Sequence, residues 1–177
     1  MKTLIHFRDF VNEMTESASR LHKQEVLKKY KDDDVIKKYL KIAYDPYTVF
    51  GISEKKLSKS VTGVTVYPAD SIFDFFYWLE KHNTGTDYAI KMCQATMEKV
   101  FATTEGCTWL LKELICKDLS IGADSKTINS IMPDLIPTFN VQLANKYFDK
   151  PDYVEGKEFA ITTKIDGGRI IAIKENG

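Results

Sequence analysis

Six consecutive residues near the C-terminus, 164–169, read Lys-Ile-Asp-Gly-Gly-Arg and combine an amine, a carboxylate and a guanidinium around two glycines. β-Branched residues on both sides predict two strands joined by a tight turn at the glycines. Side chains alternate along a strand, so Lys164 and Asp166 would share one face with Thr162. Arg169 would then open the return strand beside them.

This pattern suits nucleophilic chemistry at a phosphate. A lysine nucleophile must be neutral when it attacks, and both desolvation and a nearby cation lower the pKa of such an amine. The guanidinium of Arg169 would reach a phosphate or sugar beside Lys164, and Gly167 lets the main chain approach a ligand closely. The pattern indicates covalent capture of a phosphoryl or nucleotidyl group. The alternative is a surface hairpin with solvated charges.

The elements that precede this segment are predicted to be helical. Apolar residues recur at three- and four-residue spacing up to about Met132. We predict a mainly α fold: a multi-helix domain at 1–137, then a connector and a short β-hairpin at 138–177 that opens a second domain. Helices are expected near residues 7–14, 26–30, 36–43, 71–81, 87–101, 105–117 and 125–131.

Candidate caps and one long loop divide these helices. The predicted N-caps are Ser17 or Ser19 for the second helix, Asp33 or Asp34 for the third, and Asp124 or Ser125 for the last. Asp45-Pro46 ends the third helix. Residues 47–68 are predicted as a loop with a short extended piece at 61–66. The five aromatic residues between 73 and 78 cover all sides of a helix, so most are expected in the core.

Composition and charge exclude several classes of protein. The chain is 44% hydrophobic and 28% charged, which argues against disorder and coiled coil, and no apolar run approaches a membrane span or a signal peptide. Lys+Arg and Asp+Glu both total 25, so global charge does not point to nucleic acid. The three cysteines have no metal-ligand spacing and read as reduced thiols of a cytoplasmic protein. The three histidines are scattered and receive no role.

The segment at 164–169 resembles the nucleotidyltransferase signature Lys-x-Asp-Gly-x-Arg of ATP-dependent DNA ligases. Residues 117–123, 127–129 and 133–137 resemble the end of the helical DNA-binding domain of those ligases, and 142–144 resembles the element that precedes their catalytic domain. The similarity is closest to the small ligases of bacteriophages. It implies a monomeric protein that consists of a DNA-binding domain and the start of an adenylation domain, and that works in the cytoplasm, of the host cell if phage-encoded.

The resemblance implies a role for each residue of the motif. Lys164 would attack the α-phosphate of ATP and form lysyl-AMP, which then activates the 5′-phosphate of a nick for sealing, with Mg2+ neutralising phosphate charge. Asp166 and Gly167 would shape the turn, and Arg169 would contact the nucleotide sugar or the nick and favours ATP over NAD. Thr162 stands where these ligases often carry Glu or Gln to read adenine. Because the family's catalytic domain continues well beyond Gly177, we expect no nick sealing by the 177-residue chain alone.

Two groups of residues are predicted to contact the DNA backbone. Between residues 20 and 60 there are 11 Lys or Arg against 6 Asp or Glu, and Lys55, Lys56 and Lys59 lie there in a Ser-rich loop. The second group surrounds a glycine turn and a helix start, which present amides to phosphates; it consists of Lys117, Gly122, Lys126 and Thr127. The alternatives are solvated helix faces and an ordinary helix–loop–helix corner. The resemblance implies sequence-independent binding of nicked duplex DNA that weakens as salt rises.

Three other readings remain open. The chain can be a non-catalytic DNA-binding module in which the lysine motif is idle. It can be a relative that joins or caps RNA, although a large helical domain ahead of the lysine argues against this. It can also be a helical protein-interaction domain, which would not shift duplex DNA.

Overall fold

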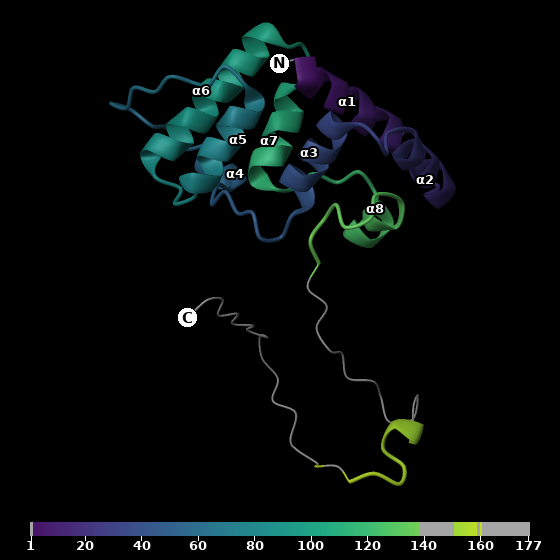
Figure 1. The fold of residues 1–177 in the computed structure, drawn as a ribbon. Coiled ribbons are helices and arrows are strands. Elements are labelled where there is room, and N and C mark those ends of the chain that lie inside the picture. The colour runs from purple at the N-terminus through teal and green to yellow at the C-terminus, as the bar shows by residue number, and fades with distance from the viewer. Residues whose placement is uncertain (1, 139–150, 159, 161–177) are drawn as a thin grey trace. The chain divides into compact units, whose positions relative to one another are not determined.

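The computed structural model describes residues 2–138, 151–158 and 160, and the chain divides into two units, Met1–Phe139 and Asn140–Gly177. Every regular element of the described residues is a helix, which confirms the predicted mainly α fold (Figure 1). The hairpin predicted around residues 164–169 lies outside the described residues. The helices are α1 (Lys2–Thr15), α2 (Arg20–Lys29), α3 (Asp34–Tyr44), α4 (Glu54–Leu57), α5 (Ile72–Lys81), α6 (Asp87–Thr103), α7 (Thr108–Cys116), α8 (Ser125–Ile131) and the 3-10 turn η2 (Pro151–Tyr153).

The helices of the first unit pack in two neighbouring groups. α1 lies against α2 and α3, and α2 lies against α8, whereas α6 packs on α4 and α7. In the view of Figure 1, α4, α5 and α6 gather on one side of this unit and α1, α2 and α8 on the other, with α3 and α7 between them. Among the described residues, no helix has both the length and the apolar character needed to cross a membrane.

Stacked aromatic rings join the first helices in the core. The rings of Phe7 and Tyr39 are fully buried and stack with centroids 4.6 Å apart, which fixes α1 against α3. The Tyr39 hydroxyl is within hydrogen-bond distance of Thr3 Oγ1, at 3.1 Å, and burial raises the pKa of Tyr39 to about 12. Of the aromatic run on α5, Phe75 and Phe76 are buried, while Tyr77 is 62% exposed.

Helix starts follow the short polar side chains in the sequence. Asp33 caps α3 by accepting the amides of Val35 and Ile36, and Asp124 caps α8. At α2, Ser19 occupies the N-cap position without a side-chain cap, and Ser17 Oγ accepts the amide of Ser19 instead.

The predicted loop at 47–68 is not entirely irregular. Ser53 Oγ accepts the amide of Lys56 at 3.4 Å, and this contact starts the single turn of α4. The piece expected to be extended, 61–66, forms no strand in the described part of the chain, since the backbone there pairs with no neighbouring segment.

Removing the α3 cap should destabilise the fold. Asp33 Oδ2 lies 2.7 Å from His6 Nε2 while Oδ1 accepts two amides, so Asp33→Ala removes the cap and the link to α1. We expect the free energy of unfolding to fall by about 1–2 kcal/mol, measured by urea denaturation at neutral pH. Asp32→Ala, next in the chain with a side chain 87% exposed, should change it little; equal losses would contradict a capping role.

The same carboxyl should give an acid-dependent loss of stability. Burial alone would raise the pKa of Asp33, but hydrogen bonds from His6 and the amides of Ile36 and Val35 outweigh it and lower the pKa. A lowered native pKa contributes stability that is present above the unfolded value near 3.8 and is lost as pH falls through the native value. The difference in stability between the parent chain and Asp33→Ala should therefore shrink below about pH 4.

Candidate nucleic-acid interface

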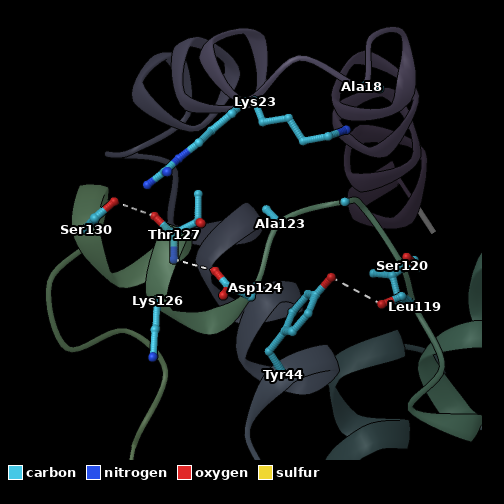
Figure 2. A pocket seen from close by; sticks show the side chains of 12 residues that line it. Ala18, Lys23, Tyr44, Leu119, Ser120, Ala123, Asp124, Lys126, Thr127 and Ser130 are labelled. Carbon is cyan, nitrogen blue, oxygen red and sulfur yellow. Dashed lines mark hydrogen bonds between the residues drawn. The ribbon is translucent and has the colours of Figure 1, made fainter. Parts of the chain in front are cut away.

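A hollow of about 720 Å³ lies between the start of α2, the end of α3, the loop before α8 and α8 itself (Figure 2). We call it the α2–α8 hollow. Its lining includes three cationic side chains, Arg20, Lys23 and Lys126, and one carboxylate, Asp124. The hollow therefore carries a local positive charge in a chain whose formal net charge is zero.

The loop before α8 is shaped by a glycine packed on a lysine. Gly122 has a φ of +68°, and a Cβ built on it would lie 2.6 Å from Cε and 2.9 Å from Nζ of Lys23. Lys23 is 6% exposed, and its amine donates to the carbonyl of Met14 near the end of α1. Glycine adopts this left-handed backbone without strain, and any other residue here would also require the end of the Lys23 side chain to shift.

Tyr44, at the end of α3, holds the adjoining part of the same loop. Its hydroxyl donates to the carbonyl of Leu119 at 3.2 Å (Figure 2). The same hydroxyl accepts the amide of Ile121 at 3.4 Å. Burial raises the pKa of this hydroxyl, partly offset by the Ile121 amide. Tyr44 therefore stays neutral near pH 7 and can act as donor and acceptor together.

The start of α8 is already occupied by its own cap. Asp124 Oδ1 accepts the amide of Thr127 at 2.8 Å, and Ser130 Oγ donates to the carbonyl of Thr127 at 2.7 Å (Figure 2). Hydrogen bonding by Thr127 lowers the pKa of Asp124, so the carboxyl is ionised near pH 7. The amide of Thr127 is therefore not free for a phosphate, so the groups in this hollow that suit an anion are the cationic side chains.

Two of the three cations in the hollow are available to a ligand. Arg20 and Lys126 are exposed, and neither forms an ion pair with any residue that the structure describes. The amine of Lys23, in contrast, is hydrogen-bonded to the carbonyl of Met14. Guanidinium and ammonium groups without acidic partners suit phosphate oxygens.

The structure brings together three of the four residues in the second predicted group. Gly122, Lys126 and Thr127 line the α2–α8 hollow. Sequence reasoning did not select Arg20 and Lys23, which lie about 100 positions earlier. The only signal was that the basic stretch begins at residue 20.

The fourth residue, Lys117, is directed into the protein. Its backbone is left-handed, with a φ of 58°, and its amine donates to the carbonyls of Ile42 at 2.9 Å and Asp45 at 2.6 Å. Burial lowers its pKa, while the charges of Asp45 and Glu80 partly oppose this. Lys117 thus binds carbonyls at the C-terminal end of α3 and does not line the hollow.

The first predicted group lies around α4 and has fewer free charges than expected. The amine of Lys56 donates to the carbonyl of Gly51 at 2.7 Å, and that of Lys59 pairs with Asp87 at 2.5 Å. Lys55 is exposed and forms no ion pair within residues 2–138. None of the three lines the α2–α8 hollow.

The predicted adenylation motif lies outside the described residues. This applies to Thr162, Lys164, Asp166, Gly167 and Arg169. Within the described residues, no group of three His, Cys, Asp or Glu side chains is placed to hold a metal ion.

Comparisons of the chain with known protein families, curated proteins and solved structures found no match. The assignment of a function therefore depends on the residues themselves and on the geometry of the α2–α8 hollow.

A side chain at Gly122 should disturb the loop that forms the hollow. We expect Gly122→Ala to lower the free energy of unfolding by more than the about 1–2 kcal/mol that a left-handed alanine costs, because its Cβ also displaces Lys23. Gly63→Ala is the matched control, since Gly63 has a φ of +72° and nothing within 4 Å of its Cβ position. Urea denaturation of both variants measures the difference, and equal losses would show that contact with Lys23 is unimportant.

Proposed function

We propose that this chain is the N-terminal part of an ATP-dependent DNA ligase, acting as a cytoplasmic monomer. Its helical unit binds nicked duplex DNA, and Lys164 is the residue that becomes adenylated. The observation that supports DNA binding most strongly is that Arg20 and Lys126, neither in an ion pair within residues 2–138, line one hollow in which Asp124 is the single carboxylate.

The positive charge of the hollow is complementary to the negative charge of a DNA backbone. Duplex DNA carries about one negative charge per 1.7 Å of helix axis, so a surface that neutralises phosphates gains affinity from each counterion released. Arg20 comes from α2 and Lys126 from α8, two helices that pack on one another. Their separation is thus fixed by the fold, which positions the protein on phosphates without reading base sequence.

The ligase assignment rests on the sequence motif. Lysine, aspartate, glycine and arginine occur at 164, 166, 167 and 169, the spacing of the nucleotidyltransferase signature. In the proposed reaction the amine of Lys164 loses a proton and bonds to the α-phosphorus of ATP, while the bond to pyrophosphate breaks. Mg2+ would neutralise the phosphates during this step.

A second candidate function is a DNA-binding module without catalysis. It is favoured by one observation, that the α2–α8 hollow is built entirely from residues 18–130 and needs no part of the second unit. Both candidates share the DNA-binding surface, and only the chemistry of Lys164 separates them.

Neutralising the two free cations of the hollow should weaken DNA binding. We expect Arg20→Gln with Lys126→Gln to bind a labelled nicked duplex about tenfold more weakly. The slope of log affinity against log salt should become shallower by about 2, since two phosphate contacts are lost. Fluorescence anisotropy at several salt concentrations measures both quantities.

The control for this experiment removes two charges elsewhere. Neither Lys81 on α5 nor Lys91 on α6 lines the hollow. The variant Lys81→Gln with Lys91→Gln should therefore retain most of the affinity for the nicked duplex. An equal loss in both double variants would show that only net charge matters and that the hollow is not the binding site.

Adenylation should depend on Lys164 alone. The proposal predicts that this chain, joined to the remaining catalytic elements of a ligase, takes a covalent label from α-labelled ATP and Mg2+. Lys164→Ala should abolish the label on a denaturing gel, whereas Lys157→Ala, which removes an exposed lysine seven positions earlier in the sequence, should keep it. A label that survives Lys164→Ala would exclude this lysine as the nucleophile.

A further inference from the structure

A second hollow, of about 500 Å³, lies next to the end of α8. It is lined by Lys31 and Asp32 in the turn after α2, by Lys37 and Lys41 of α3, and by the segment 131–135, which includes Asp134. Its three lysines therefore outnumber its two carboxylates by one. We call it the three-lysine hollow. Both hollows include residues of α8, since Lys126, Thr127 and Ser130 line the α2–α8 hollow and Ile131, the last residue of the helix, lines this one.

The lysines of this hollow are only weakly neutralised. Lys31 lies 4.0 Å from Asp32, and Lys37 lies 3.7 Å from Asp34; both carboxylates are 87% exposed. Exposed pairs at such distances contribute little and are screened by salt. Lys41 forms no ion pair with the residues that the structure describes. The three amines are therefore available to an external anion.

The opposite wall is held rigid by a side chain of α8. Asn129 Nδ2 donates to the carbonyl of Ile136 at 2.8 Å, and its Oδ1 accepts the amide of Ile136 at 2.9 Å. This pair of hydrogen bonds closes the turn in which Asp134 takes a left-handed backbone, with a φ of 56°. Asp134 lines the hollow as an exposed carboxylate without an ion pair in the described residues.

We propose that the three-lysine hollow is a second binding site for duplex DNA, so that one duplex lies along α8 and contacts both hollows. This inference rests on the proposed function. α8 has 7 residues and is therefore about 10 Å long, a length over which a duplex presents about six phosphate charges. Lysines that solvent reaches, as Lys31 and Lys41 are and Lys37 is in part, gain from a polyanion, whose counterions are released on binding, and gain little from a single small anion.

The first test removes two lysines of the hollow from the 177-residue chain. We expect Lys37→Gln with Lys41→Gln to weaken binding of a nicked duplex about five- to tenfold and to make the salt slope shallower by about 2. The matched control is Lys28→Gln with Lys38→Gln, which removes two exposed lysines of α2 and α3 that line neither hollow. Circular dichroism establishes that all variants are folded.

The second test removes one of the two carboxylates that line the hollow. Asp134→Asn keeps a residue that tolerates a left-handed backbone, and it should increase affinity for the nicked duplex about two- to threefold. Asp74→Asn is the control, since Asp74 is exposed on α5 and lines neither hollow. This variant makes the same change in net charge and should alter affinity much less.

The outcomes separate this inference from the proposed function. If the parent chain does not bind nicked duplex DNA at low salt, the proposed function fails and the second site fails with it. If the parent chain binds and Arg20→Gln with Lys126→Gln weakens it, while the lysine pair on α3 behaves like its control, only the second site is overturned. Selective loss at Lys37 and Lys41 together with a gain at Asp134 supports it.

Discussion

One buried amine sets the shape of the surface that we propose as the DNA-binding site. Lys23 donates to the carbonyl of Met14 near the end of α1, and its stem fills the space beside Gly122. Burial of a charged group is costly unless it is hydrogen-bonded, so this contact restricts how α1, α2 and the loop before α8 can be arranged. The positions of the exposed cations Arg20 and Lys126 follow from this arrangement of α1, α2 and the loop before α8.

The lysines of the helical unit divide into those that support the fold and those that face solvent. Lys23 and Lys117 bind carbonyls near the ends of α1 and α3, so their charge offsets the negative end of a helix dipole. Lys59 is neutralised by Asp87. Lys41 and Lys126 have no such partner in the described part of the chain. A count of basic residues in one stretch of sequence is therefore larger than the number of positive charges that are free to bind a ligand.

Local sequence patterns predicted the helices, whereas long-range contacts determine which residues come together in the α2–α8 hollow. Apolar spacing and capping residues such as Asp33 and Asp124 are encoded within a few positions, so the mainly α fold was predictable. The meeting of Arg20 with Lys126 depends on the packing of α2 against α8, which no local pattern encodes. For the same reason, the sequence could not distinguish inward Lys117 from outward Lys126.

The most direct measurement of DNA binding by these hollows is lysine acetylation footprinting of the unmodified chain, with and without a nicked duplex. DNA should protect Lys126, Lys37 and Lys41, and it should leave Lys28 and Lys38 as reactive as before, since neither of these lines a hollow. Protection confined to Lys28 and Lys38, or no protection at any lysine at low salt, would contradict binding at this surface.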